Sequence, residues 1–249
     1  MSKGSLNVCV LASDNYLWAL RPFSFLFNTF WDDHEIVRIF GFRKPDFRLP
    51  VNFHFISIKE DQYNHNRWAN GLLDMVKILK DQHIRHFILM LEDYWLYEFA
   101  DSKKIGHLVR YMQSNPDVLR MDLSNERNSK RHVKEIDHYA NMDIIEAPPR
   151  TSYMMSFQAG IWNINLMQQV IFPDESPWDA EIDGTKRLWD QPSMRVLGTR
   201  QWLLKYTPAV RRHKEGINLD RIPNSLTHVM KKRGWLDDHH VPIQRRSNM

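Results

Sequence analysis

The stretch RHFILMLEDYWLYEFAD, residues 85–101, decides the fold of this chain. It contains a continuous apolar run, HFILML (86–91), which is typical of a central strand buried on both faces of a sheet. Two adjacent carboxylates, Glu92 and Asp93, end the run, and aromatic residues follow at once. Unpaired carboxylates at the edge of a core are costly, so we expect a cation, a hydrogen-bond donor or water beside them.

Strand and helix patterns alternate around this run. Four further strands are predicted, over residues 6–12, 35–42, 51–58 and 118–124. Apolar residues recur at helical spacing in two segments between them, 66–82 and 101–117. This alternation predicts an α/β fold in which helices flank a mostly parallel central sheet. Ligands of such sheets bind beyond the carboxyl ends of the strands, where Glu92 and Asp93 would lie.

The second half of the chain is less regular. Residues 125–143 are polar and charged and predict a surface loop or a mobile segment. The double proline within 146–153 predicts an extended, non-helical chain. An apolar stretch, 154–171, follows, and we expect a short helix over 165–171.

A second chemical feature is an acidic and aromatic cluster within residues 172–191. Its acids surround Trp178 and are Glu175, Asp179, Glu181 and Asp183. A tryptophan ring packs on the apolar face of a sugar while carboxylates accept hydrogen bonds from hydroxyl groups, and one carboxylate could serve as a general base. The alternative is a helix that Ser176-Pro177 caps and whose first turn is acidic. Both interpretations hold together, because a helix N-terminus can carry a functional acid.

Composition places the chain among ordinary globular proteins. It has 249 residues, of which 43% are hydrophobic and 26% are charged, so it can bury a sizeable core in one large or two small domains. No apolar stretch approaches the ~20 residues of a membrane-spanning helix. The segment around the single cysteine, Cys9, predicts a first strand and not a signal peptide. One cysteine excludes an internal disulfide, and we expect a cytoplasmic protein.

Charge is unevenly distributed. Residues 186–249 hold 14 Lys and Arg against 5 Asp and Glu, a net charge of +9, whereas the whole chain carries +4 and residues 1–185 therefore −5. A basic end on an acidic body indicates an anionic partner, such as nucleotide phosphates, nucleic acid or a membrane surface. A solvated basic tail is the alternative.

Four stretches together resemble a known family, the GT-A nucleotide-sugar glycosyltransferases of bacterial or phage type. They are VCVLASDNY, NRWANGLLDMVKIL, HFILMLEDYWLYEFAD and SFQAGIWNINLMQQVIFPDESPWDAE, and the resemblance covers residues 6–184. It implies one GT-A-like domain with an irregular acceptor-side second half. Its parts would be a nucleotide-sugar-binding half (1–124), an acceptor-side half (125–212) and a basic C-terminal segment (213–249).

The resemblance also implies a reaction, the transfer of a sugar from a nucleotide-sugar donor to a hydroxyl acceptor. Asp93 and Glu92 would hold a divalent cation, Mn²⁺ or Mg²⁺, that bridges the donor diphosphate. His213 or His228 would be an extra metal ligand. This chain departs from the family pattern because Tyr94 stands where the motif usually has a third acid, so the cation would be weakly held or absent. The basic residues Arg211, Arg212 and Lys214 would then stabilise the leaving diphosphate.

The remaining residues that the resemblance assigns would bind the two substrates. Those near the base, the ribose or the charge of the nucleotide would be Asp14, Asn15, Tyr16 and Arg67. Those lining the sugar and acceptor pocket would be Gln158, Trp162 and Trp178. If the enzyme inverts the anomeric configuration, Asp179 or Glu181 would take the acceptor proton.

Alternative functions remain open at this point. The acceptor is a carbohydrate or, as in some phage enzymes, a hydroxymethylated DNA base, which the basic C-terminal segment would favour. A non-catalytic nucleic-acid-binding protein would stack bases on aromatic residues interleaved with the basic residues of 186–249, namely Trp189, Trp202, Tyr206 and Trp235. A metal-dependent hydrolase is a third class, but the twelve histidines show no HxH or HExxH spacing. The sequence does not predict an oligomeric state.

Overall fold

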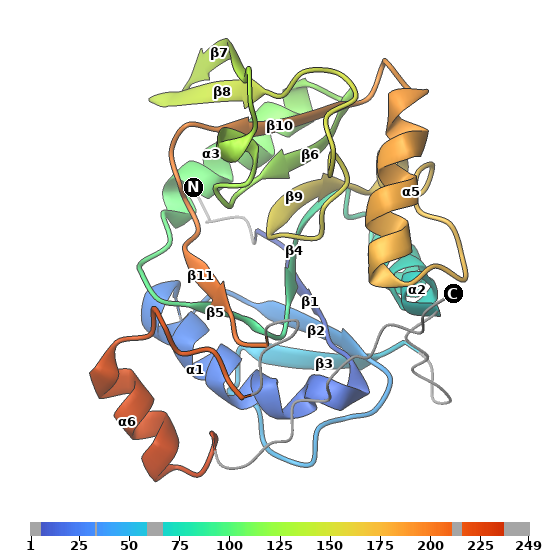
Figure 1. Ribbon diagram of the computed structural model, residues 1–249. Coiled ribbons are helices and arrows are strands. Elements are labelled where there is room, and N and C mark those ends of the chain that lie inside the picture. The colour runs from blue at the N-terminus through green and yellow to red at the C-terminus, as the bar shows by residue number, and fades with distance from the viewer. Residues whose placement is uncertain (1–5, 33, 59–66, 211–215, 237–249) are drawn as a thin grey trace.

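A nine-stranded sheet runs through the computed structural model, in which residues 6–32, 34–58, 67–210 and 216–236 are described (Figure 1). Its strand order is β3-β2-β1-β4-β9-β6-β10-β8-β7. The strands are β1 (Val8–Leu11), β2 (Val37–Gly41), β3 (Phe53–Ser57), β4 (His86–Leu91), β6 (Val118–Asp122), β7 (Lys134–Tyr139), β8 (Met142–Glu146), β9 (Gly160–Asn163) and β10 (Arg195–Thr199).

The direction of the strands fits the prediction of a mostly parallel sheet. Strands β1 to β4 are mutually parallel where they pair, and β10 is parallel to β6. Strand β9 lies antiparallel between β4 and β6, and β8 lies antiparallel between β10 and β7. Only β8 and β9 therefore oppose the common direction, and the carboxyl ends of the other strands meet at one edge.

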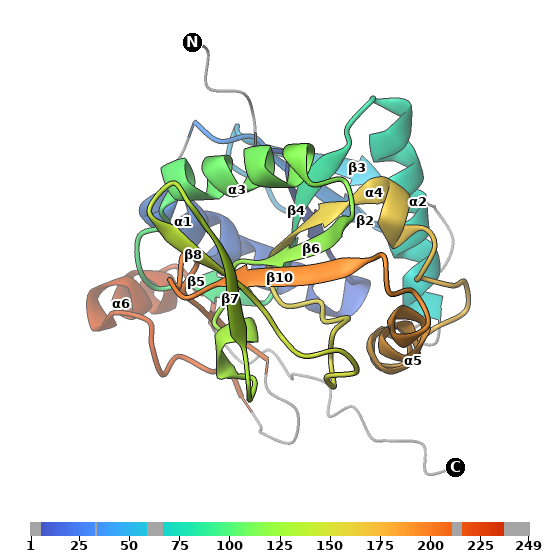
Figure 2. The ribbon, with the colours of Figure 1, turned by 90° about the horizontal axis from the view of Figure 1, so that it is seen from above.

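Helices cover both faces of the sheet (Figure 2). The helices of the described residues are η1 (Asp14–Ala19), α1 (Leu20–Phe30), α2 (Trp68–Asp81), α3 (Ser102–Ser114), η3 (Arg127–Ser129), α4 (Ile164–Met167), α5 (Pro177–Trp189) and α6 (Asn224–Lys232), the last of which lies to one side of the sheet, beyond α1. Strand β4 shows how one core forms on each side. Ile88 and Met90 pack with residues of α1 and α3, whereas Phe87 and Leu89 pack with residues of α2, α4 and α5. This alternation of two buried faces explains the uninterrupted apolar run.

The predicted elements of the first half are confirmed. Strand β4 spans the predicted residues 86–91, and α2 and α3 lie within the two predicted helical segments. Asp101 caps α3 by accepting a hydrogen bond from the backbone N–H of Lys104 at 3.0 Å. The predicted cap of α5 is also present, since Ser176 and Asp179 form a reciprocal capping box with Pro177 at the first helical position.

Two expectations for the second half were wrong. Residues 134–146, within and just beyond the predicted loop, form the β7–β8 hairpin, whose turn residues Ala140 and Asn141 both have positive φ. Strand β7 is exposed almost throughout, so it lacks the apolar alternation that marks a strand. The helix expected over 165–171 is the shorter α4, which directly follows strand β9.

A second, two-stranded sheet explains why aromatic residues follow the acids at 92 and 93. Strand β5 (Tyr94–Leu96) pairs antiparallel with β11 (Tyr206–Pro208). The backbone N–H of Ala209 also donates to the carbonyl oxygen of Asp93 at 2.7 Å. The late part of the chain is thereby fixed beside the end of β4. Within the described residues, no helix is both long and apolar enough to cross a membrane.

Candidate functional site

The two strand-end acids lie where adjacent parallel strands β1 and β4 end. Glu92 is 5% exposed, and its carboxylate accepts a hydrogen bond from the backbone N–H of Ser13 at 2.9 Å. Burial and the neighbouring charge of Asp93 raise the pKa of Glu92 to about 8. Hydrogen bonds from Ser13 and from the backbone of Glu92 thus offset only part of the cost of burying this charge.

Asp93 is half-buried and faces the late part of the chain. Burial raises the pKa of its carboxyl group to about 7, against a hydrogen bond from the backbone of Val210 that lowers it. Neither strand-end acid forms an ion pair with a basic side chain of the described residues. A cation placed beside the pair would therefore relieve an unbalanced charge.

The donor set at this position fits a cation only in part. Within the described residues no group of three His, Cys, Asp or Glu could hold a metal ion. Mg²⁺ is commonly bound by one or two carboxylates together with substrate phosphates, and two carboxylates are what this strand end offers. Tyr94 contributes no ligand, because its ring is buried against Tyr206 with the ring centroids 4.6 Å apart.

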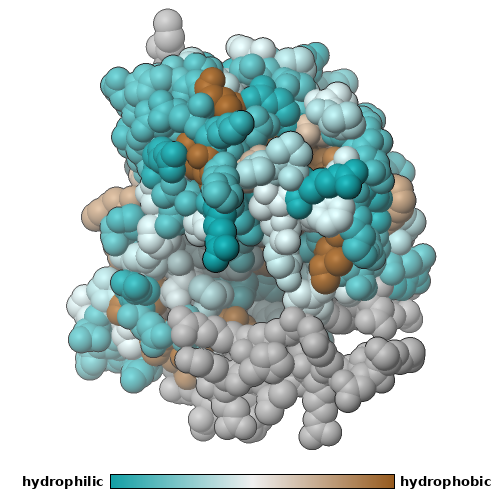
Figure 3. All heavy atoms as spheres, turned by 45° about the horizontal axis from the view of Figure 1, so that its top comes forward, coloured by the Kyte–Doolittle hydropathy of each residue, from teal (hydrophilic) through white to brown (hydrophobic). Residues whose placement is uncertain are grey.

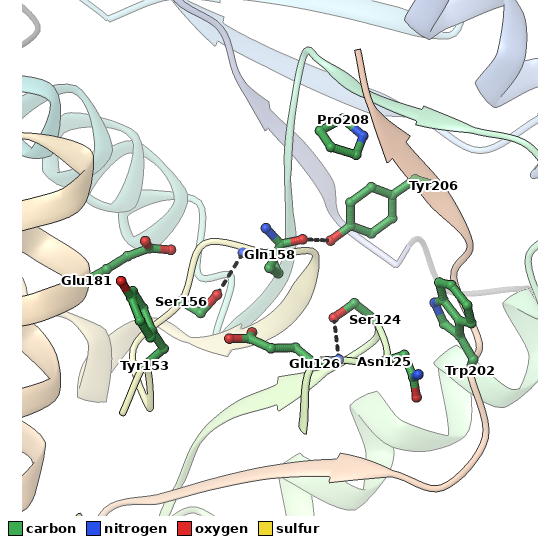
Figure 4. A pocket seen from close by; sticks show the side chains of 10 residues that line it. All are labelled: Ser124, Asn125, Glu126, Tyr153, Ser156, Gln158, Glu181, Trp202, Tyr206 and Pro208. Carbon is green, nitrogen blue, oxygen red and sulfur yellow. Dashed lines mark hydrogen bonds between the residues drawn. The ribbon is translucent and has the colours of Figure 1, made fainter. Parts of the chain in front are cut away.

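A pocket of about 390 Å³ opens at the same edge of the sheet, and Figure 3 shows a hollow in the middle of a largely hydrophilic face. Its walls come from residues that follow β6 and β10, precede β9 or belong to β11 and α5. The lining residues are Ser124, Asn125, Glu126, Tyr153, Ser156, Gln158, Glu181, Trp202, Tyr206 and Pro208 (Figure 4). The pocket therefore lies where ligands of open α/β sheets bind.

Glu181 enters the pocket from α5, one helical turn after its N-terminus. Its carboxylate accepts a hydrogen bond from the backbone N–H of Phe157 at 2.7 Å. Burial raises the pKa of Glu181 to about 7, and the negative charge of Glu126 adds to the rise. A carboxyl group with such a pKa is suited to accept a proton near neutral pH.

A chain of hydrogen bonds runs from the pocket to Tyr94, the residue that follows the strand-end acids. The hydroxyl of Tyr206 donates to Gln158 Oε1, and Gln158 Nε2 donates to the hydroxyl of Tyr94 at 3.4 Å. Burial raises the pKa of Tyr94, and so do Tyr206 and the negative charges of Asp93 and Glu181. The negative charges of Asp93 and Glu181 therefore both raise the pKa of Tyr94, and the two acids lie on the same side of the molecule.

Two fully buried arginines donate hydrogen bonds to the backbone of the segment that lines the pocket. Arg120 on β6 donates to the carbonyl oxygen of Gln158 at 2.9 Å and to Asp122 at 3.3 Å. Arg127 donates to the carbonyl oxygen of Tyr153 at 3.2 Å. Asp122 also accepts from the backbone N–H of Arg127 at 2.8 Å. The 153–158 segment is thus fixed through its backbone by charged side chains that do not reach the surface.

Glu126 lies between two cations at the wall of the pocket. Its carboxylate oxygens are each 3.7 Å from a nitrogen, one from Arg120 Nη2 and the other from Lys130 Nζ. The backbone N–H of Glu126 donates to Ser124 Oγ at 3.1 Å. These contacts hold the carboxylate of Glu126 at the wall of the pocket.

The acid and tryptophan cluster is divided by the fold. Glu181 and Gln158 line the pocket, whereas Asp179 is exposed and accepts hydrogen bonds from Ser176 Oγ and N. Trp178 lies half-buried in the first turn of α5. Trp162 is completely buried in the core on β9, with the guanidinium of Arg120 over its ring, and does not line the pocket as expected. Its position on a central strand keeps it away from solvent.

The expected nucleotide-binding residues are spread around the end of β1. Asp14 accepts a hydrogen bond from the backbone N–H of Arg43 at 3.0 Å, Asn15 is exposed and Tyr16 is half-buried. Arg67 is exposed and forms an ion pair with Asp174 at 2.6 Å, so it already has an anionic partner.

The histidines and basic residues that the resemblance assigned are described only in part. His228 is exposed on α6, in the C-terminal part of the chain. Arg211, Arg212, His213 and Lys214 lie outside the described residues.

Several lining residues were not expected from the sequence, above all Glu126, Tyr153 and Ser156. Glu126 lies in the segment that was predicted to be a loop. Tyr153 ends the segment that contains the double proline, and Ser156 lies near the start of the apolar stretch 154–171. Trp202 and Tyr206 were considered only as surfaces for stacking bases. A cluster of polar residues next to a predicted strand end, at 124–126, is the signal that could have indicated Glu126.

The fold and the site define a three-layer α/β protein with a polar pocket at the carboxyl edge of its sheet. The chain is similar at low identity to two solved structures. One is a UTP-bound UGPase from Acinetobacter baumannii, with a TM-score of 0.43 and 10% identity over 81% of this chain and 88% of that one. The other is a CMP:2-keto-3-deoxy-manno-octonic acid synthetase complexed with CTP, with a TM-score of 0.43 and 12% identity over 92% and 99%. No protein-family model and no curated protein matches the chain.

Proposed function

We propose that the protein is a glycosyltransferase that moves a sugar from a nucleotide-sugar donor to a hydroxyl group of an acceptor. The observation that carries this proposal is the position of Glu181. It is a half-buried acid with a pKa of about 7 in a polar pocket, and Gln158 in that pocket donates a hydrogen bond to Tyr94, the residue that follows the acids at the end of β4. The sequence resemblance adds the reaction class.

In the proposed reaction, Glu181 is the general base. Its carboxylate takes the proton of the acceptor hydroxyl, and the oxygen of that hydroxyl attacks the anomeric carbon of the donor sugar. The bond between this carbon and the diphosphate oxygen breaks, and a nucleoside diphosphate leaves with the bonding electrons. The expected stereochemical outcome is inversion, because one displacement occurs at the anomeric carbon. Asp179 is the weaker candidate, because its carboxylate is engaged in the cap of α5.

The donor would bind at the ends of β1 and β4. Asp93, with Glu92 beside it, would hold a Mn²⁺ or Mg²⁺ ion that stabilises the charge of the departing diphosphate. Asp93 is the better placed of the two, because Glu92 already accepts the hydrogen bond from Ser13. Asn15 and Tyr16 are the candidates for contacts to the ribose or base, since both lie in η1, the first helix after β1.

The acceptor that we propose is a carbohydrate. Hydroxyl groups donate hydrogen bonds to carboxylates and amides, and Glu126, Glu181 and Gln158 supply those acceptors in the pocket. A hydroxymethylated DNA base is the alternative acceptor, which rests on the basic C-terminal segment.

A donor screen tests the function directly. The full chain is incubated with a panel of nucleotide sugars and Mn²⁺, and release of nucleoside diphosphate is measured with a neutral glycoside, with hydroxymethylated DNA or with no acceptor. Acceptor-dependent release supports the proposal and identifies the acceptor class. The absence of release with every donor, together with salt-dependent DNA binding, would instead indicate a non-catalytic nucleic-acid-binding protein.

A further inference from the structure

Tyr153 is an exposed aromatic residue in a strained backbone conformation at the wall of the pocket. Its φ is +56°, a region that bulky side chains rarely adopt, and its side chain is 47% exposed. Such conformations persist only where the surrounding structure imposes them, and they concentrate at ligand-binding sites. Two questions follow: which contacts impose the positive φ of Tyr153, and whether its exposed ring binds a ligand.

The structural cause is Arg127. This arginine is 1% exposed and donates from Nη2 to the carbonyl oxygen of Tyr153 at 3.2 Å. Gly198 on β10 makes room for it, since a Cβ at that position would lie 2.7 Å from Arg127 Cβ. A buried charged group thus fixes the backbone on which an exposed ring is carried.

The ring itself is positioned for contact with a ligand. Lys130 Nζ lies 5.5 Å from the centroid of the Tyr153 ring, and the ring lies beside Glu181 in the close view of the pocket (Figure 4). On the other side of the pocket is Trp202, which is 40% exposed. The side chains between these two aromatics are polar, including Ser156, Gln158 and Glu126.

We propose that Tyr153 is an acceptor-binding residue, held by Arg127 so that its ring stacks on the apolar face of a neutral sugar. Flat aromatic surfaces combined with hydroxyl-binding side chains suit a pyranose, which has an apolar face and a polar rim. The inference rests on the proposed function, because it assigns the acceptor of the same site. The stacking places an acceptor hydroxyl beside Glu181.

Direct binding measurements test the proposal without turnover. Calorimetric titration of the full chain, in EDTA and without donor, uses methyl glycosides of gluco, galacto and manno configuration up to their solubility limits. We expect at least one to bind the wild-type protein and to bind Tyr153→Ala about three- to tenfold more weakly, as expected for the loss of one stacking contact. Tyr153→Phe should bind like the wild type.

Three further variants separate binding from folding. Tyr153→Gly should lose the same affinity without a lower unfolding temperature, because glycine adopts positive φ without strain. Arg127→Met should weaken binding by releasing the backbone of Tyr153. Phe99→Ala removes an aromatic residue that is 79% exposed outside the pocket and should leave affinity unchanged.

Three results would overturn the proposal, and the first two concern glycoside binding. One is that no glycoside binds the wild-type protein, and the other is that Tyr153→Ala binds as the wild type does. Preferential, Tyr153-dependent binding of nucleosides would also overturn it, because it would assign the ring to a base. Tyr153-dependent glycoside binding without nucleoside diphosphate release from any donor would sustain the sugar site and reject the transferase.

Discussion

Gln158 Nε2 donates a hydrogen bond to the hydroxyl of Tyr94, although 64 residues separate them in the sequence. Tyr94 directly follows the two acids at the end of β4, and Gln158 lies two residues before β9 in the wall of the pocket. This bond connects the proposed donor side with the proposed acceptor side. It exists because β9 inserts antiparallel next to β4 and so begins at the edge where β4 ends.

Replacement of the proposed base should abolish most of the turnover. We expect Glu181→Gln to lower kcat by a factor of about 10² to 10⁴, the usual contribution of a general base. The matched control is Asp183→Asn on the same helix, whose carboxylate pairs with Lys186 and should be dispensable. Circular dichroism checks that both variants fold. Full activity of Glu181→Gln would remove this residue from the mechanism.

Activity should rise with pH around neutrality. Glu181 acts as a base only when ionised, so kcat/KM should increase up to about pH 7 and then level off, following its raised pKa. In Glu126→Gln the neighbouring negative charge is lost, which lowers the pKa of Glu181. The rise of kcat/KM should therefore occur at lower pH in this variant. Glu135→Gln, an exposed acid on β7, is the control. If kcat/KM of Glu126→Gln rises at the same pH as in the wild type, Glu126 does not influence the pKa of Glu181.

Removal of the divalent cation should weaken nucleotide binding through Asp93. Titration of a nucleoside diphosphate, followed by tryptophan fluorescence, should give tighter binding with Mn²⁺ than with EDTA in the wild-type protein. We expect Asp93→Asn to lose this difference, whereas Asp81→Asn at the end of α2 should keep it. If Asp93→Asn still responds to Mn²⁺, the ion is held elsewhere.

The buried acids should make the protein less stable as pH rises. The pKa values of Glu92, Asp93 and Glu181 are all raised in the folded state, so between about pH 4.5 and about pH 8 the unfolded chain releases protons that the folded chain retains. The free energy of unfolding therefore falls over this range. For a domain of this size each ~1 kcal/mol lowers the Tm by about 2–4 °C. Calorimetric Tm values measured against pH should fall less steeply for Glu92→Gln, and identical slopes would contradict the assignment.

Gly198 should tolerate no side chain. A Cβ there would lie 2.7 Å from Arg127 Cβ and 3.4 Å from Asp122 Cβ, so we expect Gly198→Ala to destabilise the fold by about 1–3 kcal/mol through overpacking. Gly106→Ala in α3 is the control, because the nearest contact of a new Cβ would be at 3.6 Å and alanine favours a helix by roughly 0.5–1 kcal/mol. Urea unfolding measures both. Equal stability of the two variants would refute this account of Gly198.

The sequence was most informative where burial is regular. Strand β4 was predicted because both of its faces are buried, and α2 because one face meets the core at helical spacing. The β7–β8 hairpin escaped prediction because β7 faces solvent and carries no apolar pattern. Strand β9 escaped it because its four residues lie in a longer apolar stretch that also suits a helix.

The site could be predicted only where its residues lie close together in the sequence. Glu181 was identified from the cluster of acids around Trp178, which is a feature of nearby residues, and Gln158 was assigned by the resemblance to the glycosyltransferase family. Tyr153 owes its position to Arg127, which is 26 residues earlier and buried against β10, and no sequence period records such a contact. Glu126 likewise lines the pocket only because β6 ends beside β9 and β10.

The pairing of β5 with β11 has a consequence for synthesis of the protein. Strand β10, the last strand of the large sheet, ends at Thr199, whereas the pocket also needs Tyr206 and Pro208. A nascent chain thus contains every strand of the large sheet before it contains these two residues. During synthesis the strands of the large sheet therefore emerge before the last residues that line the binding pocket.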